Sequence, residues 1–141
     1  SLPRINPIVD LANACSLAYR VPIGAHDIDT FAENPLTVRR ATADDVSLPM
    51  GDSAAERADL GEIIYVVAND IRTRRWVWRQ ARTALVGPDS CNVLFPIDGF
   101  SPQTTTAVRD AADLLASTIQ SVWNISTVTG FVTVECQGFS L

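Results

Sequence analysis

The sequence lacks the features of a membrane-spanning or secreted protein. No stretch of its 141 residues approaches the roughly 18 uninterrupted apolar residues that a membrane-spanning helix needs. The N-terminus has neither a charged leader with an apolar run nor an initiating Met, so we predict no secretory signal and expect further residues upstream. A composition of 47% apolar and 19% charged residues is typical of a soluble globular protein. We therefore expect a cytoplasmic protein without a membrane partner.

Side chains that bind metals or form disulfides are scarce. Cys15, Cys91 and Cys136 are odd in number and far apart, without the paired spacing that holds zinc. We expect all three to be small buried side chains in a reducing compartment. The carboxylates of the acidic segment 42–61 lack the spacing and turn glycine of a calcium-binding loop. Neither a metal nor a cofactor is therefore predicted.

Several familiar signatures of chemistry are also missing. The sequence contains no phosphate loop, dinucleotide fingerprint or nucleophile elbow. Its net charge of −5 argues against loose, sequence-independent adhesion to nucleic acid, which depends on excess positive charge. Lysine is absent, and all eleven basic residues are arginine. This choice suits planar, bidentate contacts with carboxylate or phosphate, or it reflects codon usage alone.

The arginines concentrate in segment 72–82, which holds five of the eleven cations and two of the three tryptophans. If 71–80 is extended, strand alternation places one set of side chains on a shared face. That set is Arg72, Arg74, Trp76, Trp78 and Gln80. Such a face suits stacking on a nucleotide or an aromatic amino acid. The structural alternative pairs these arginines with the acidic residues of 44–62 and places the tryptophans in the core, although exposed pairs contribute only about 0 to 1 kcal/mol each.

The element order predicts an α+β fold. A capping residue followed by proline opens helices over 7–19 and 102–123. The core face of the second helix should comprise Val108, Ala111, Leu115, Ile119 and Val122. Strands are expected over 36–41, 62–68, 91–97 and 128–136, with a solvated connection over 42–61. We expect a single domain over 1–141, with a mixed, largely antiparallel β-sheet packed with two main helices.

Two polar residues outside the arginine-rich segment are candidates for a site. His26, the only histidine, lies beside Asp27 and Asp29. An imidazole near a carboxylate can act as a general base or orient a substrate, and it can equally be a hydrogen-bonded structural residue. Asn13 falls in the middle of the first helix, where it either points into a cleft or lies on a solvated face.

Four segments together resemble a known family. Segments 2–13, 22–29 and 36–41 are similar to the B3/B4 editing domain in the β subunit of phenylalanyl-tRNA synthetase. The run Arg74-Arg75-Trp76-Val77-Trp78-Arg79-Gln80 looks like the mark of freestanding relatives of that domain. The resemblance covers nearly the whole chain and implies a B3/B4-like fold in a freestanding form.

The resemblance implies hydrolysis of a wrongly charged aminoacyl-tRNA in translation quality control, since the synthetase domain removes tyrosine from tRNA-Phe. Because the ester between amino acid and ribose is already activated, a positioned water and hydrogen-bond donors for the oxyanion suffice. The absence of a catalytic triad in this sequence agrees with such a site.

The family residues carry over unevenly. Asn13 matches the Asn of the first motif, but Ala12 stands where the synthetase has Thr. Gly24 replaces the His of the second motif, and His26 occupies a position where the synthetase has Phe. Because glycine cannot hold a substrate as histidine does, the amino-acid specificity of the synthetase is not transferred. Gln80 aligns loosely with the acidic residue of the synthetase site.

These assignments predict a freestanding deacylase that binds the acceptor end of an aminoacyl-tRNA. His26, Asn13 and Gln80 are expected at the aminoacyl group. The expected substrate-binding residues are Arg75 and Arg79 at the phosphate or terminal adenosine, Trp76 and Trp78 at the pocket wall, and Gly24 and Asp27. The alternative is a non-catalytic module that binds a tRNA end, an amino acid or a nucleotide in the same place.

Overall fold

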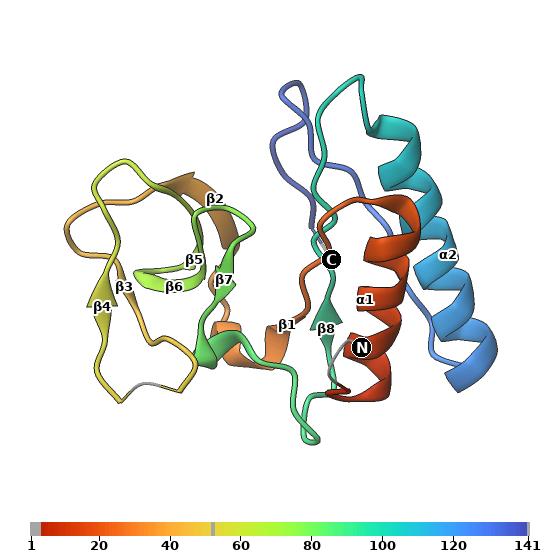
Figure 1. The fold of residues 1–141 in the computed structure, drawn as a ribbon, viewed down its shortest axis with the longest axis horizontal. Helices are drawn as coiled ribbons and strands as arrows, with labels where there is room; N and C mark the ends of the chain where they lie inside the picture. The colour runs from red at the N-terminus through yellow and green to blue at the C-terminus, as the bar shows by residue number, and fades with distance from the viewer. Residues whose placement is uncertain (1–3, 52, 141) are drawn as a thin grey trace. The chain divides into compact units, whose positions relative to one another are not determined.

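The computed structural model describes residues 4–51 and 53–140 (Figure 1). The chain divides into two compact units, which are described separately. Unit 1 comprises Ser1–Ile23 and Ile97–Leu141, and unit 2 comprises Gly24–Pro96. Positions 2 and 3 of the first family motif and position 52 of the acidic segment lie outside the described residues.

The predicted α+β class is confirmed. The structure has two α-helices and a six-stranded mixed sheet in which all but one of the strand pairings are antiparallel. A second sheet of two short strands and two 3₁₀ helices complete the described elements. No helix in the described part of the chain is long and apolar enough to cross a membrane.

The first helix of unit 1, α1, spans Pro7–Tyr19 and confirms the predicted bounds. Asn6 caps it, since its side-chain oxygen accepts a hydrogen bond of 2.9 Å from the Val9 N–H. The helix ends at Arg20, which adopts the left-handed conformation with φ of 57°. Its buried residues are Ala12 and Cys15.

The second helix, α2, spans Thr105–Trp123 and begins three residues later than predicted. Residues 101–104 form a turn instead, because the Thr104 hydroxyl accepts a 2.7 Å hydrogen bond from the Phe100 N–H. Ala111, Leu115 and Ile119 are buried, as expected. Val122 is 62% exposed, so its assignment to the core was wrong. The helices α1 and α2 lie side by side in unit 1.

The strand predicted over 128–136 is absent, and this prediction was wrong. The segment is β-branched and aromatic, but it has no strand partner among the described residues. Its backbone hydrogen bonds are local, such as the 2.8 Å bond from the Thr133 N–H to the Cys136 carbonyl. A strand requires a neighbouring ladder, which residue propensity alone does not supply.

Unit 2 contains the six-stranded sheet in the order β2-β5-β6-β3-β4, with β7 paired to β6. Its strands are β2 (Leu36–Arg40), β3 (Val46–Ser47), β4 (Glu56–Arg57), β5 (Ile63–Val67), β6 (Asp70–Arg74) and β7 (Arg79–Gln80). The strand predicted over 62–68 is confirmed as β5, and its last four residues are buried, as is typical of a continuously apolar strand covered on both faces. Ala41, Ile64, Val66 and Ile71 form the core cluster of this sheet.

The smaller sheet of unit 2 pairs β1 (His26–Asp27) with β8 (Val93–Leu94) in antiparallel register, and His26 lies opposite Leu94. The strand predicted over 91–97 is therefore shorter than expected. Two 3₁₀ helices lie between β1 and β8 in the sequence: η1 (Ile28–Phe31) follows β1, and η2 (Arg82–Ala84) precedes β8. They place Thr30 and Thr83 within reach of the sheet, as described below.

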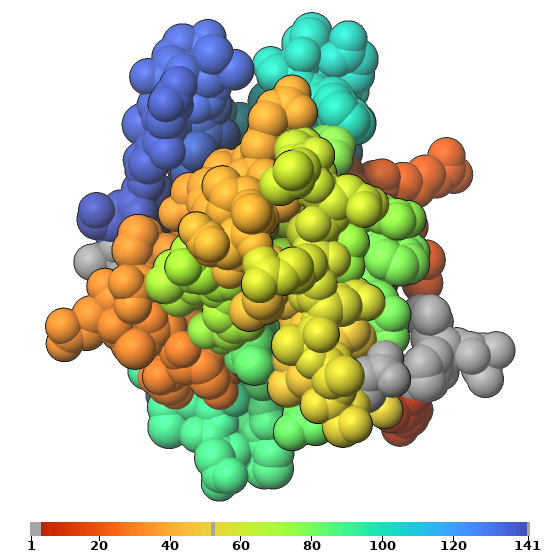
Figure 2. All heavy atoms as spheres, turned by 90° about the vertical axis from the view of Figure 1, so that its left-hand side faces the viewer, coloured from red at the N-terminus to blue at the C-terminus, as the bar shows by residue number. Residues whose placement is uncertain are grey.

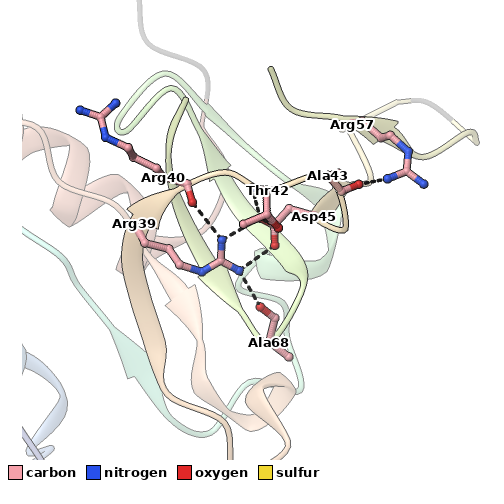
Figure 3. A network of polar contacts seen from close by, with 7 residues as sticks. All are labelled: Arg39, Arg40, Thr42, Ala43, Asp45, Arg57 and Ala68. Carbon is pink, nitrogen blue, oxygen red and sulfur yellow. Dashed lines mark hydrogen bonds and ion pairs between the residues drawn. The ribbon is translucent and has the colours of Figure 1, made fainter. Parts of the chain in front are cut away.

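Segment 42–61 is not a purely solvated connection, because it contributes β3 and β4 and a fully buried carboxylate. Figure 2 shows much of this segment, in yellow, on the surface of unit 2. Asp45 is 0% exposed, and its two oxygens accept 2.7 Å hydrogen bonds from the Arg39 guanidinium. The Thr42 N–H and hydroxyl also donate to it, at 2.7 and 2.9 Å (Figure 3).

The cysteine prediction was right for one residue of three. Cys15 is buried in α1, and burial raises the pKa of its thiol. Cys91 and Cys136 are exposed, because they lie in segments without regular packing. All three are free thiols.

Asp45→Asn should lower the free energy of unfolding at pH 7 by about 2 kcal/mol. Arg39 lowers the pKa of Asp45 from 3.8 to about 2. This shift corresponds to about 2 kcal/mol of additional stabilisation of the charged carboxylate in the folded protein. The stabilisation is present above pH 3.8 and is lost as the pH falls toward 2. Urea denaturation measures it, with Asp44→Asn at the exposed neighbour as control. Equal loss in both variants would contradict the account.

Candidate functional site

The arginine and tryptophan segment forms a hairpin rather than one extended face. Strand β6 ends at Arg74, the chain reverses over 75–78, and β7 returns so that Arg79 lies opposite Arg74. Arg75 and Trp76 adopt positive φ angles of 47° and 64°. The predicted common face of alternate residues through 80 was therefore wrong. Alternation holds only within a continuous strand, and this strand ends before the tryptophans.

Arg74 is a structural residue at the base of this turn. Its Nε and Nη2 donate to Glu62 at 2.6 and 2.7 Å, and its Nη1 donates to Glu56 at 2.8 Å. The Arg74 and Glu62 side chains are only 8% and 6% exposed. The interaction raises the pKa of Arg74 and lowers the pKa of Glu62. The structural alternative from the sequence thus holds for this arginine.

Arg72 is a second buried arginine with a structural environment. Its guanidinium donates to the Thr30 hydroxyl and the Thr83 carbonyl, both at 2.7 Å. It also lies 5.3 Å from the centre of the Phe31 ring. Its Nε forms an ion pair with an Asp70 carboxylate oxygen at 3.2 Å, but this contact is not a hydrogen bond. Arg72 therefore joins η1 and η2 to the sheet.

The turn itself presents an exposed cation–π pair. The Arg75 guanidinium lies 4.8 Å from the centre of the Trp78 ring. The Arg75 side chain is 58% exposed, and Trp78 is also 58% exposed. The Arg75 guanidinium lies 3.9 Å from the carboxylate of Asp59, which is 83% exposed. An exposed pair of this kind contributes little energy to the fold, so this surface is available for a ligand.

The other two candidates of the turn are half-buried. The Trp76 N–H donates to the Ile63 carbonyl at 2.7 Å, which ties the turn to β5. The Arg79 guanidinium donates to the Met50 carbonyl at 3.4 Å. Neither Trp76 nor Trp78 is buried. The structural alternative, which placed both tryptophans in the core, was therefore wrong on this point.

His26 is the buried polar residue with an unsatisfied atom. It is 2% exposed, its ring lies 6.0 Å from that of Tyr65, and its Nδ1 has no hydrogen-bond partner among the described residues. Burial, and secondarily the positive charge of Arg72, lower the pKa of His26 from 6.5 to about 4. The imidazole is therefore neutral at pH 7.

Gly24 lies so close to the His26 imidazole that a side chain at position 24 would contact the ring. A Cβ atom added at Gly24 would lie 3.3 Å from His26 Nε2, which is tighter than ordinary contact. The Gly24 N–H donates to the Pro96 carbonyl at 3.0 Å, so the backbone here is fixed. A side chain at position 24 would therefore press on the imidazole. Glycine at 24 and histidine at 26 form a matched combination.

Gln80 adjoins the same region through the backbone. Its Nε2 donates to the carbonyls of Ala25 and Ala84, at 2.5 and 2.9 Å. Both N–H groups of the amide are thus engaged in the fold. Gln80 connects β7 to the residue that precedes His26, and it supports the site rather than offering a donor to a ligand.

Asp27 does not pair with His26. Its two oxygens accept hydrogen bonds from the Asp29 N–H at 2.9 Å and the Ser90 hydroxyl at 2.5 Å. Neighbouring residues of a strand point to opposite sides, which explains the separation. Asp27 caps η1 and holds the 87–92 loop. The sequence interpretation of an imidazole paired with a carboxylate is not what the structure shows.

Asn13 is half-buried on α1 and belongs to unit 1, whereas the remaining candidates belong to unit 2. Within unit 2 the structure groups Gly24, His26 and Gln80 around Ala25, and it groups Arg75 with Trp78 on the turn. Among the described residues, no group of three or more His, Cys, Asp and Glu side chains is arranged to hold a metal ion.

The family model described as the B3/4 domain matches residues 1–121. The chain belongs to the B3/4 domain family. A search of curated proteins finds no match. The matched region contains every candidate residue named above, and residues 122–141 lie beyond it.

Sequence reasoning missed two residues of this B3/4 domain that shape the site. Tyr65 covers the imidazole of His26, and Glu62 supports the turn with a 2.8 Å hydrogen bond to the Arg75 N–H. Tyr65 was hidden in a continuous apolar run. Glu62 carried a signal, since an acidic residue opening a buried strand needs a cationic partner.

His26 should titrate with a midpoint near about 4 in the folded protein and near 6.5 in urea. Because the folded-state pKa is lowered, protonation favours unfolding, and stability should fall as the pH drops from 6.5 toward 4. Imidazole NMR shifts measure this without assignment, since the chain has one histidine. A folded-state midpoint near 6.5 would show that His26 is solvated.

Proposed function

We propose that this B3/4 domain is a freestanding trans-editing hydrolase that deacylates a mischarged aminoacyl-tRNA in the cytoplasm. The observation that carries the proposal is the buried, neutral His26 with an unsatisfied Nδ1, in a chain of the B3/4 family. The resemblance to the phenylalanyl-tRNA synthetase editing domain supplies the substrate class.

The reaction requires little from the protein beyond positioning. Water adds to the ester carbonyl, the bond from the carbonyl carbon to the ribose oxygen breaks, and the ribose hydroxyl leaves with a proton. A neutral imidazole accepts a hydrogen bond from the attacking water through Nδ1 and orients it. With a pKa of about 4, His26 is a weak base, so it acts by orientation more than by proton abstraction.

Access to His26 requires a local movement, because the residue is 2% exposed. Gly24 is the adjacent position without a side chain, and we assign it and Asp27 to the segment that admits the aminoacyl group. Gln80 is proposed as the residue that fixes the backbone beside His26. The role of Asn13, which belongs to unit 1, stays a prediction from the sequence.

The turn residues are assigned to the acceptor end of the tRNA. Trp78 and Arg75 offer a flat, positively charged surface, and Arg79 adds a second cation in the same hairpin. Trp76 shapes the turn through its link to Ile63. These residues bind substrate and do not take part in the chemistry.

A second function is a non-catalytic module that binds a tRNA end, an amino acid or a nucleotide. The low pKa and the burial of His26 favour it, because both oppose a role in proton transfer. The exposed Arg75–Trp78 pair serves either function. Saturable binding with no turnover distinguishes this alternative from the hydrolase.

Incubating the full-length protein with a panel of mischarged tRNAs should reveal at least one that loses its amino acid well above the spontaneous rate. His26→Gln should lower kcat by about tenfold or more, since the loss of a positioned group costs that order. Arg75→Ala should mainly raise KM. The control is Arg57→Ala, which removes an exposed arginine on β4.

Near-UV circular dichroism of each variant identifies any loss of folding. Spontaneous-rate deacylation across the panel by the folded wild-type protein would overturn the hydrolase proposal. Binding of the same tRNAs would then support the alternative. If His26→Gln alters neither kcat nor KM in an active protein, His26 is structural.

A further inference from the structure

The turn over 75–78 has a strained backbone. Arg75 and Trp76 are consecutive non-glycine residues with φ of 47° and 64°. Left-handed conformations of this kind cost on the order of 1–3 kcal/mol each and persist only where the surroundings enforce them. Such outliers cluster at ligand-binding and functional sites.

A buried ion pair enforces this conformation. Glu62 accepts the Arg75 N–H at 2.8 Å through the same oxygen that accepts Arg74 Nε at 2.6 Å. The Ile63 carbonyl accepts the Trp76 N–H at 2.7 Å. Two successive backbone N–H groups of the turn are therefore held by two successive residues at the start of β5. Glu62 is itself fixed, because Arg74 Nη2 donates to its other oxygen at 2.7 Å.

The enforced turn presents a surface with stacking and charge. Arg75 lies over the Trp78 ring, and both side chains are more than half exposed. Val77 and Ile63, which belong to or hold the turn, are 42% and 37% exposed. Segment 72–82 contains no acidic residue. The surface therefore combines an aromatic face, apolar edges and an exposed cation, whose ion pair with the exposed Asp59 is long, at 3.9 Å.

We propose that the turn over 75–78 is a preformed stacking platform for an unpaired nucleobase, and that Glu62 is its positioning residue. This inference deepens the proposed function and rests on it for the natural occupant, a single-stranded tRNA end. The base stacks on Trp78, and Arg75 meets the adjoining phosphate. A duplex offers no free base face and binds poorly.

A base is favoured over a free aromatic amino acid by the exposure of the platform. Small ligands bind in concave sites that bury most of their surface. Trp78 instead stands 58% exposed on a hairpin turn, as suits the end of a larger molecule whose remaining contacts lie elsewhere. The cation beside the ring matches the phosphate that accompanies every base.

Quenching of tryptophan fluorescence by a short single-stranded RNA ending in CCA measures the platform directly. The wild-type protein should bind this RNA and not the same sequence sequestered in a duplex. Trp78→Phe should weaken binding modestly, and Trp78→Ala should weaken it by about tenfold or more, as expected for one base–aromatic stack. Anisotropy of a labelled RNA provides the readout for the Trp78 variants.

Glu62→Gln tests the positioning role against a matched control. Glu56 also pairs with Arg74, at 2.8 Å, but its carboxylate contacts the Arg74 side chain and not the backbone of the turn. Glu62→Gln should weaken RNA binding several-fold and alter the near-UV spectrum of the tryptophans, whereas Glu56→Gln should change neither. Equal effects of the two variants would overturn the role of Glu62.

A pair of substitutions at Arg75 tests the strain. Arg75→Gly and Arg75→Ala both remove the guanidinium, but only glycine adopts positive φ freely. The glycine variant should melt at a higher temperature than the alanine variant, and both should bind RNA more weakly than wild type. Identical melting temperatures would show that the turn is unstrained.

The outcomes separate this inference from the proposed function. Binding of single-stranded RNA through Trp78 without any deacylation refutes the hydrolase and leaves the platform intact. If the wild-type protein and the Trp78→Ala variant deacylate the substrate at the same rate and bind RNA with the same affinity, the platform is refuted and the hydrolase proposal stands. Displacement of the RNA by free tyrosine or phenylalanine would reassign the platform to the amino acid.

Discussion

The ion pair between Glu62 and Arg74 is the interaction on which the candidate surface depends. It is nearly excluded from water, with side chains 6% and 8% exposed, and one Glu62 oxygen serves both Arg74 and the Arg75 N–H. Removing Arg74 would leave the buried Glu62 carboxylate without its cation, and removing Glu62 would leave Arg74 with the half-exposed Glu56 as its remaining ion-pair partner. Loss of one partner from a buried ion pair is strongly unfavourable. The fold thereby holds a turn that its own residues would not favour.

A different constraint governs His26. Burial under Tyr65 and the nearby charge of Arg72 keep its imidazole neutral, while Gly24 leaves the space that the ring occupies. A neutral ring with an unsatisfied nitrogen can orient water but is a poor base. Chemistry at an activated ester fits such a group, because the ester needs a positioned nucleophile more than a strong base.

The sequence predicted those elements whose signals are local. The Asn6 cap, the apolar run of β5 and the core positions Ala111, Leu115 and Ile119 of α2 were confirmed, because each depends on neighbouring residues. The hairpin at Arg75 was missed because its left-handed residues are not glycine or asparagine, and the partner that enforces them, Glu62, lies distant in sequence, just before β5. The buried Asp45 was missed for the same reason, since its partner Arg39 makes burial possible.

In the proposed complex, one substrate end engages both the Trp78 platform and His26. The most direct measurement is NMR of the protein with a non-hydrolysable, amide-linked 3′-aminoacyl-adenosine. The account predicts that the Trp78 indole and the His26 imidazole resonances shift together, with the same saturation midpoint. A shift of the indole alone would contradict a shared site, and a shift of neither would contradict both assignments.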